Sequence, residues 1–226
     1  MNRFGKIVAS TIDYVGKLLC PPHCICCDEQ FKINDDRVFC QKCYEEILAR
    51  IADSTSKGTS EIISGSYSLL PYNCWYSRKI IAHAKYVSSK VFLLEIGNFA
   101  YQSMANHNLI PLIDVITFTP RRPNQVRYYG FDQSEELAVA ISTATGIPCK
   151  TLLKRVGFAR AQKKLKGKDR AKNVKGKFIG TENIDNKNIL LIDDVVTTGS
   201  TIAECARILK ENGANKIYTW TLSSKV

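Results

Sequence analysis

The sequence predicts an α/β protein, with a parallel sheet and flanking helices behind a small cysteine-rich module that binds zinc. Three observations carry this prediction. From residue 61 onward, short β-branched and apolar runs alternate with longer helical patterns, as in parallel α/β proteins. One apolar run, at 189–192, leads directly into two aspartates and the loop sequence TTGST. Six of the nine cysteines lie between Cys20 and Cys43.

Length and composition favour one main domain with a small addition. The chain has 226 residues, of which 45% are hydrophobic, which is enough for a packed core. The stretch DSTSKGTS contains no large apolar residue and is typical of a linker. We therefore expect a first part at 1–52 with an N-terminal helix and the cysteine module, a linker at 53–60, and the main domain at 61–226.

Apolar residues recur at helical spacing over residues 3–19, which predicts an amphipathic helix. Its apolar side either packs on the rest of the protein or makes a peripheral contact with a membrane or a partner. No apolar run is long enough to cross a membrane, and the start of the sequence lacks the features of a signal peptide. We expect a cytoplasmic protein in a reducing compartment, with a peripheral position at the inner membrane as the alternative.

The other elements follow from periodicity and from turn residues. Asp132 with Glu135, and Thr201 with Glu204, have the spacing of helix capping boxes, and Pro120 stops the strand before it. Helices are expected at 44–52, 77–87, 92–105, 132–146 and 201–213. Strands are expected at 62–70, 113–120, 147–153, 188–195 and 216–222.

Four of the clustered cysteines form two C-x2-C pairs with twelve residues between them. Two such pairs supply the tetrahedral sulfur shell that Zn²⁺ prefers, and four protein ligands make a closed, structural site. The expected ligands are Cys24, Cys27, Cys40 and Cys43. Cys20 or Cys26 could replace a ligand of the first pair, so its register stays open. Direct contact of this module with nucleic acid is a second interpretation of its role.

The stretch ILLIDDVVTTGSTIAE at 189–204 combines features that attract different parts of one ligand. The loop follows a strand and opens a helix, so its N–H groups and hydroxyls suit a phosphate. Asp193 and Asp194 would repel a phosphate alone, but they suit sugar hydroxyls or a divalent cation. A phosphorylated sugar with Mg²⁺ satisfies both halves of the stretch. A Walker A loop is excluded because the sequence has no G-x4-G-K.

The stretch ILLIDDVVTTGST resembles the phosphoribosyl-pyrophosphate (PRPP) motif of type I phosphoribosyltransferases. A four-cysteine module before such a domain resembles the ComF family of competence proteins. Further segments resemble that family in order, namely AKYVSSK, FTPRRPNQVRYYGFDQSEELA and ARAQKKLKGKDRAKNVKGKF. The chain departs from the family pattern at Tyr129, where an arginine is usual, at Asp132, where asparagine is usual, and at a strand end that keeps only Pro120.

This resemblance implies a type I phosphoribosyltransferase-like sheet that binds PRPP together with Mg²⁺. The two aspartates would hold the ribose hydroxyls, the loop would hold the 5-phosphate, and the arginines would face the pyrophosphate. The implied PRPP-binding residues are Lys85, Arg121, Arg122, Arg127, Asp193, Asp194, Val195, Val196, Thr197, Thr198, Gly199, Ser200 and Thr201. No general acid or base is identified.

The net charge of +11 is concentrated in one segment. Residues 150–177 contain twelve Lys or Arg and one acid, so this segment alone accounts for +11. Such a block is either a solvated loop or a surface for a polyanion, and the resemblance adds a loop over the site that clamps the pyrophosphate. The expected nucleic-acid contacts are Lys163, Lys164, Lys166, Lys168, Arg170 and Lys172. Phe158, Phe178, Tyr128 and Tyr129 are the candidates for stacking on bases.

Three functions are consistent with these patterns. The first is a ComF-type protein that handles single-stranded DNA during natural transformation, with the DNA-uptake machinery as a partner. The second is an active phosphoribosyltransferase of nucleotide or related metabolism, which would be an enzyme of pentosyl transfer. The third is a PRPP-sensing or scaffold protein without chemistry. The basic segment favours the first function, and the complete PRPP motif favours the second.

Overall fold

The computed structural model describes residues 18–19, 21–51, 55–56, 60–87, 89–156 and 176–225. Their helices are α2 (Gln41–Ile51), α3 (Trp75–Tyr86), α4 (Lys90–Asn106), α5 (Pro123–Tyr129), α6 (Gln133–Thr145) and α7 (Ser200–Glu211), with the short 3-10 helix η1 (Ile110–Leu112). Their strands are β1 (Thr55–Ser56), β2 (Gly65–Pro71), β3 (Val115–Phe118), β4 (Leu153–Arg155), β5 (Phe178–Gly180), β6 (Ile189–Val196) and β7 (Ile217–Ser224).

Five strands form the central sheet in the order β1-β2-β7-β6-β3. Strands β2, β7, β6 and β3 are parallel, and the two-residue strand β1 pairs with β2 in the antiparallel sense. The predicted parallel α/β fold is therefore confirmed. Strand β7 is buried along almost its whole length and β6 along its first five residues, which explains the continuous apolar run at 189–192.

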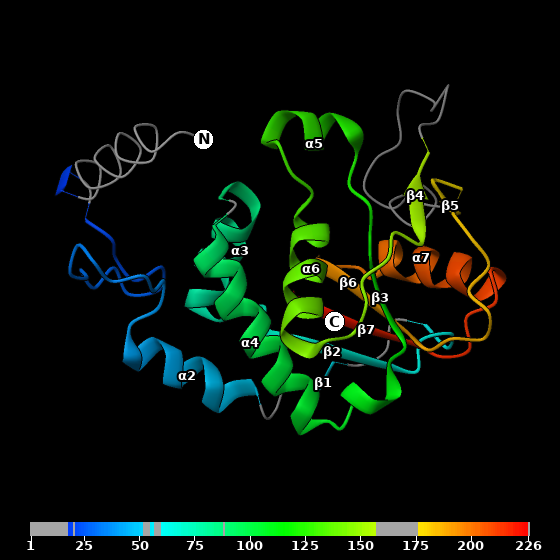
Figure 1. The fold of residues 1–226 in the computed structure, drawn as a ribbon, viewed down its shortest axis with the longest axis horizontal. Coiled ribbons are helices and arrows are strands. Elements are labelled where there is room, and N and C mark those ends of the chain that lie inside the picture. The colour runs from blue at the N-terminus through cyan, green and yellow to red at the C-terminus, as the bar shows by residue number, and fades with distance from the viewer. Residues whose placement is uncertain are drawn as a thin grey trace, which may run out of the picture.

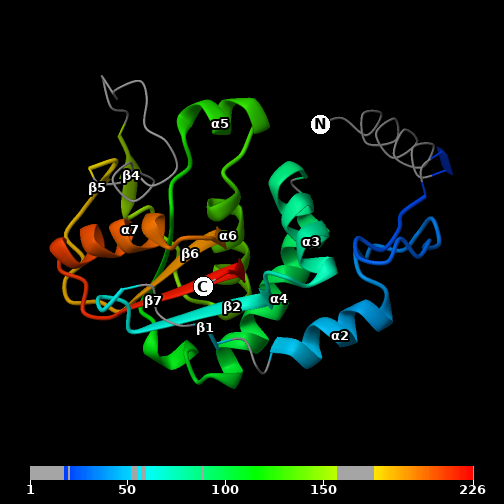
Figure 2. The same cartoon turned by 180° about the vertical axis from the view of Figure 1, so that it is seen from behind.

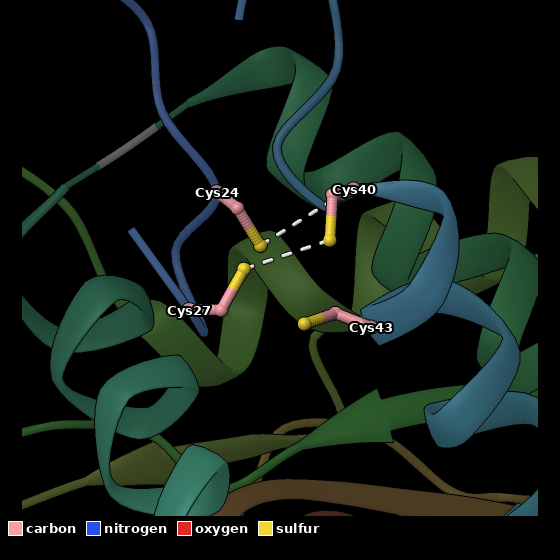
Figure 3. A group of neighbouring side chains, drawn as sticks. All are labelled: Cys24, Cys27, Cys40 and Cys43. Carbon is pink, nitrogen blue, oxygen red and sulfur yellow. Dashed lines mark hydrogen bonds between the residues drawn. The ribbon is translucent and has the colours of Figure 1, made fainter. Parts of the chain in front are cut away.

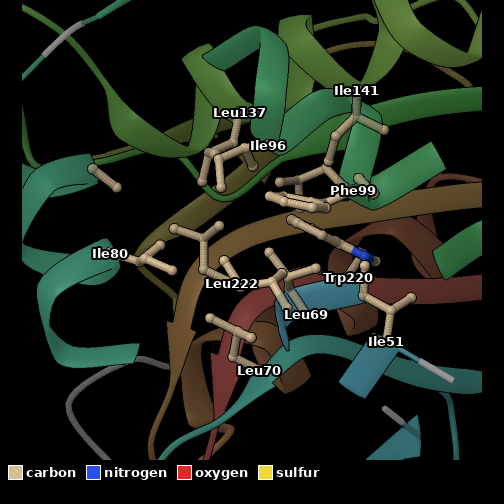
Figure 4. Close-up of a cluster of buried hydrophobic side chains, with 14 of the residues drawn as sticks. Ile51, Leu69, Leu70, Ile80, Ile96, Phe99, Leu137, Ile141, Trp220 and Leu222 are labelled. Carbon is tan, nitrogen blue, oxygen red and sulfur yellow. The ribbon is translucent and has the colours of Figure 1, made fainter. Parts of the chain in front are cut away.

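Helices cover both faces of this sheet, as Figures 1 and 2 show from opposite sides. Helices α4 and α6 pack on one face, and α7 packs on the other together with the separate β4–β5 pair. The first face holds the larger apolar cluster, with Phe99, Leu137, Trp220 and Leu222 at its centre (Figure 4). At Gly97, a β-carbon would lie 2.8 Å from the Ala140 carbonyl oxygen, so the approach of α4 to α6 requires glycine.

The cysteine segment packs into the same core as the main domain. Phe39 contacts Phe92 and Phe99 of α4, with ring centroids 6.5 and 5.7 Å apart. Lys79 of α3 donates to the Cys26 carbonyl oxygen at 2.7 Å and to the Asp28 carboxylate at 2.6 Å. These contacts hold the module against α3 and α4. The module therefore shares the apolar core of the main domain and does not need one of its own.

Apart from the short elements η1 and β5, which were not expected, the predicted elements differ from the structure in four places. The expected strand at 147–153 is wrong. Cys149 makes a single bridge to Ile116, and the chain then leaves the sheet to form β4, because Pro148 has no N–H for a longer ladder. Helix α5 was not expected, although Pro123 at its first position is a common helix start. The stretch expected as a linker contributes β1, and residues 52–54 and 57–59 lie outside the described part.

The fourth difference concerns the start of α7. The expected capping box of Thr201 and Glu204 is wrong, because the N-cap residue is Gly199, with φ of 69°. The Glu204 carboxylate instead accepts from the backbone N–H of Gly176 at 2.9 Å and from the guanidinium of Arg207. In α6, by contrast, the Asp132 carboxylate accepts from the Ser134 N–H at 3.1 Å, which confirms Asp132 as its cap.

Candidate functional site

The carboxyl ends of the parallel strands meet at one edge of the sheet. Pro71 of β2 lies opposite Ser224 of β7, and Ser224 lies opposite Val196 of β6. Strand β3 ends beside Ile192, and the Thr119 N–H donates to the Ile192 carbonyl oxygen at 3.0 Å. Parallel α/β sheets bind ligands at this edge, so it is the candidate site.

Residues 197–199, which we name the β6–α7 loop, join β6 to the start of α7. Gly199 has the left-handed conformation that favours glycine, and the first helical bond runs from the Ala203 N–H to the Gly199 carbonyl oxygen at 2.8 Å. No side chain of the described residues caps this helix start. The hydroxyls of Thr198 and Ser200 lie 2.6 Å apart beside it. Uncapped N–H groups with nearby hydroxyls suit a phosphate.

Asp193 is buried, and its Oδ1 accepts three hydrogen bonds. The donors are the Thr119 hydroxyl at 2.6 Å, the Ser134 hydroxyl at 3.2 Å and the Asp194 N–H at 3.0 Å. Burial, followed by the charge of Asp194, raises the pKa of Asp193 to about 7, although the three donors oppose this shift. Asp193 thus joins the ends of β3, α6 and β6 into one network.

Asp194 differs from Asp193 in its surroundings. Its side chain is half-buried, and its Oδ1 accepts from the Val195 N–H at 2.7 Å. The side chains of Thr197 and Thr198 are exposed, and those of Ser200 and Thr201 are half-buried. Of the two adjacent carboxylates, Asp194 is thus the one that is partly exposed beside the loop, whereas Asp193 is buried beneath it.

The expected basic residues lie on the elements that follow β2 and β3. Lys85 is near the end of α3, and its carbonyl oxygen accepts from the Gln133 side chain at 2.5 Å. The Arg121 N–H donates to Asp132 at 2.7 Å, and its guanidinium lies 4.9 Å from the centre of the Tyr129 ring. Arg122 is the N-cap residue of α5, and Arg127 is exposed in its last turn.

Two further cations, Arg155 and Lys177, were not assigned to the site from the sequence. The Arg155 Nη1 donates to the Pro120 carbonyl oxygen at 3.4 Å, and its guanidinium lies 4.9 Å from the centre of the Phe178 ring. Burial and then the charge of Arg122 lower the pKa of both Arg155 and Lys177. Arg122 before α5, Arg155 in β4 and Lys177 before β5 repel one another, so together they attract an anion. These cations could not be assigned from the sequence, because the antiparallel pairing of β4 with β5, which brings Arg155 and Lys177 together, was not predicted.

Several features expected from the sequence lie outside the described residues. This holds for the helix expected at 3–19 apart from its last two residues, for Cys20, for Phe158, and for the lysines and arginines between 157 and 175. Phe178 was expected to stack on a base, and this is wrong, because its side chain is 1% exposed beneath Arg155. Tyr128 and Tyr129 are near the carboxyl edge, at the end of α5.

The four expected zinc ligands come together (Figure 3). The sulfur atoms of Cys24, Cys27, Cys40 and Cys43 all lie within 4.8 Å of one another. Those of Cys27 and Cys40 are 3.6 Å apart, close to the roughly 3.8 Å between two ligands of a tetrahedral Zn–S4 site. The Cys40 N–H donates to the Cys24 sulfur at 3.4 Å, as expected for a thiolate ligand. The cluster is consistent with zinc.

Cys26 is not part of this cluster. Its side chain is buried in the apolar core, and its sulfur atom is not among the four that lie within 4.8 Å of one another. The expected pairing of Cys24 with Cys27 therefore agrees with the structure of the first turn. Its tight geometry includes Asp28 at φ of 63°.

Within the described residues, every helix is too short or too polar to cross a membrane.

Comparison with known proteins identifies the type of domain and its relatives. A profile for the phosphoribosyl transferase domain matches residues 135–225. Competence protein F of Haemophilus influenzae is 27% identical over 169 residues, which cover 66% of this chain and 73% of that protein. The DNA utilization protein YhgH of Salmonella typhi is 32% identical over 114 residues, or 50% of each chain, and that of Escherichia coli K12 is 35% identical over 96 residues, or 41% of each. The match thus spans half or less of the YhgH proteins.

Two solved structures to which the chain has low similarity are an adenine phosphoribosyltransferase and a glutamine PRPP amidotransferase. Adenine phosphoribosyltransferase of Leishmania tarentolae has a TM-score of 0.39 and 15% identity, and the match covers 63% of this chain and 75% of that chain. Glutamine PRPP amidotransferase of B. subtilis has a TM-score of 0.43 and 19% identity, with coverage of 63% and 30%. The family profile, the curated relatives and the cysteine cluster agree with the resemblance drawn from the motifs. The chain is a homologue of competence protein F and YhgH, with a phosphoribosyl transferase domain and a four-cysteine cluster at its N-terminal end.

Proposed function

We propose that the β6–α7 loop binds PRPP with Mg²⁺, and that the protein uses this site while handling single-stranded DNA. The observation that carries the first half is the order of groups along β6. A partly exposed carboxylate, Asp194, is followed by a loop of hydroxyls and by a helix start that no described side chain caps. These groups match the hydroxyls and the 5-phosphate of a phosphorylated ribose.

The residues divide between the parts of this ligand. N–H groups at the start of α7 and the hydroxyls of Thr198 and Ser200 would hold the 5-phosphate. Asp194 would accept from a ribose hydroxyl, while Asp193 keeps the strand end in position through Thr119 and Ser134. Mg²⁺ would be held with the pyrophosphate and would neutralise part of its charge. Arg121, Arg122 and Arg127 would face the pyrophosphate. Lys85, Val195, Val196, Thr197 and Thr201 complete the proposed set.

The DNA half of the proposal rests on charge and on relatives. The segment 150–177 has a net charge of +11, and its described ends, at Arg155 and Lys177, lie beside Arg122 at the carboxyl edge. The relatives are called competence protein F and DNA utilization protein. A dense basic segment binds a single strand mainly through its phosphates, so affinity should fall with salt. Contacts with the DNA-uptake machinery and with a membrane, through residues 3–19, remain predictions.

The DNA half is tested by fluorescence anisotropy with a labelled oligothymidine over a series of salt concentrations. One variant replaces Lys163, Lys164, Lys166 and Lys168 with glutamine, and a matched control replaces four exposed lysines elsewhere, at Lys32, Lys42, Lys187 and Lys216. We expect the first variant to lose affinity and to show a smaller dependence on salt, by about 0.7 in the logarithmic slope for each phosphate that no longer binds a lysine. Equal curves for the two variants would refute this half.

A second function, phosphoribosyl transfer, is favoured by the completeness of the loop motif. It predicts release of pyrophosphate from PRPP in the presence of some nucleobase or amine. Asp193→Asn combined with Asp194→Asn should abolish that release, because the ribose loses the Asp194 carboxylate and the strand end loses the Asp193 carboxylate that positions it. The assay is a coupled measurement of pyrophosphate across a broad panel of acceptors, and no release with any of them would exclude the enzyme within that panel.

A further inference from the structure

Three tyrosines from two helices form a continuous ring contact at the carboxyl edge. The Tyr86 and Tyr129 ring centroids are 5.6 Å apart, and those of Tyr128 and Tyr129 are 4.8 Å apart in an edge-on arrangement. Tyr86 is the last residue of α3, and the other two are the last residues of α5. We name Tyr86, Tyr128 and Tyr129 the tyrosine stack.

The tyrosine stack is unusually open for aromatic side chains. Tyr128 is 81% exposed and Tyr86 is 63% exposed, and the neighbouring Val87 is also exposed. Aromatic rings bury a large apolar area when they pack in a core. Two exposed rings in contact with a third are therefore typical of a binding surface.

The sequence segments that carry the tyrosine stack are basic. The sequence contains no acidic residue from 62 to 94 or from 115 to 131, whereas these stretches carry Lys85, Arg122 and Arg127 next to the stack. Asp132, the acid that follows, is buried and accepts from the N–H groups of Arg121 and Ser134. The segments that carry the tyrosine stack are therefore both aromatic and basic, and the next acids in the sequence after Asp132 are Glu135 and Glu136 in the first turn of α6.

Arg121 connects the tyrosine stack to the candidate PRPP site. Its guanidinium lies over Tyr129, and within the described part of the protein its buried Nη1 has no hydrogen-bond acceptor. A buried, unpaired donor of a charged group is costly and indicates that an acceptor binds there. Helices α3 and α5, which follow β2 and β3, stand close together at this edge in Figures 1 and 2.

We propose that single-stranded DNA stacks its bases on the tyrosine stack, with its phosphates on the flanking cations, so that the strand crosses the same edge of the sheet as the PRPP site. This inference rests on the proposed handling of single-stranded DNA and assigns the surface for it. Aromatic faces with cations beside them bind single strands of any sequence, because every base has a stacking face. A folded protein partner would need acidic groups around an apolar patch and is the alternative outcome of the test.

The test compares two labelled oligonucleotides of equal length, oligothymidine and an abasic strand with the same phosphates. The zinc-loaded full chain is titrated by anisotropy next to Tyr86→Leu with Tyr128→Leu. We expect the double variant to bind oligothymidine about tenfold or more weakly, as for the loss of at least one stacked base, and to bind the abasic strand unchanged. Tyr86→Phe with Tyr128→Phe should restore the wild-type value, because phenylalanine keeps the ring.

The matched control is Tyr101→Leu, since Tyr101 is an exposed tyrosine on α4. Thermal melting checks that the variants are folded. Unchanged oligothymidine affinity in the double variant, or equal losses for both strands, would overturn the inference and leave the stack to a protein partner or to a purely electrostatic role. If the wild-type chain binds neither strand, the proposed DNA function itself fails, so the two failures are distinguishable.

Discussion

Replacing Asp193 with asparagine should change how the stability of the protein depends on pH. The Asp193 carboxyl is buried among Thr119, Ser134 and the Asp194 N–H, and its pKa is raised from 3.8 to about 7. In the unfolded chain the same group loses its proton near pH 4. Between these values the folded state binds more protons than the unfolded state, so stability must fall as pH rises through this window.

The size of the effect follows from the two pKa values. A shift of about three pH units corresponds to about 4 kcal/mol between the protonated and ionised forms. Of this, about 2 kcal/mol is lost between pH 5.5 and pH 8, and the rest is lost below that range. The window above pH 5.5 is the useful one, because acid also releases metal from thiolate ligands. Asparagine carries no charge at any pH, so it removes this term.

The assay is urea unfolding of the zinc-loaded protein at several pH values from 5.5 to 8. We expect Asp193→Asn to become more stable relative to the wild type, by about 2 kcal/mol, as pH rises across this range. Asp185→Asn, at an exposed site whose left-handed backbone suits asparagine, is the control and should follow the wild type. A difference between Asp193→Asn and wild type that does not change with pH would refute the assignment of Asp193 as a buried, destabilised carboxylate.

Three further predictions concern zinc, the loop and the missed cations. Cys43→Ala should lower bound zinc below one ion per chain and reduce the melting temperature, whereas Cys26→Ala should keep one ion. The zinc content is measured by atomic absorption, and equal zinc contents in the two variants would contradict the ligand set. Gly199→Ala should lower the free energy of unfolding by about 1–2 kcal/mol, because alanine is strained at a φ of 69°; an unchanged urea midpoint would contradict this. Arg155→Gln should weaken PRPP binding about tenfold in calorimetry, while Lys154→Gln should have little effect. Equal affinities of the two variants for PRPP would show that Arg155 is not part of the site.

The sequence predicted the strands that are buried on both faces and the helices whose capping residues are their neighbours in the chain. Strand β6 is apolar because both of its faces are covered, and α6 was located by its cap at Asp132 and by Gly146, which has φ of 75°. The four-cysteine cluster could also be predicted from the sequence, since two C-x2-C pairs have the spacing of a tetrahedral zinc site whatever the rest of the fold.

What the sequence did not predict depends on contacts between distant segments. Glu204 has the spacing of a capping box, but the backbone of Gly176 and the side chain of Arg207 compete for its carboxylate. Asp193 and Asp194 are neighbours in the sequence, but successive side chains of a strand point to opposite faces of the sheet. The two carboxylates therefore lie in different surroundings. The contact of Tyr86 with Tyr129 joins residues 43 positions apart, so no local pattern signals it.

The claim that the β6–α7 loop is a PRPP site is tested most directly by calorimetric titration of the zinc-loaded full chain with PRPP, with and without Mg²⁺. We predict one site per chain that requires Mg²⁺, with affinity at least tenfold lower in Asp194→Asn and unchanged in Asp185→Asn. Saturation that is equal in wild type and Asp194→Asn, or no binding by the wild type in excess Mg²⁺, would contradict this account.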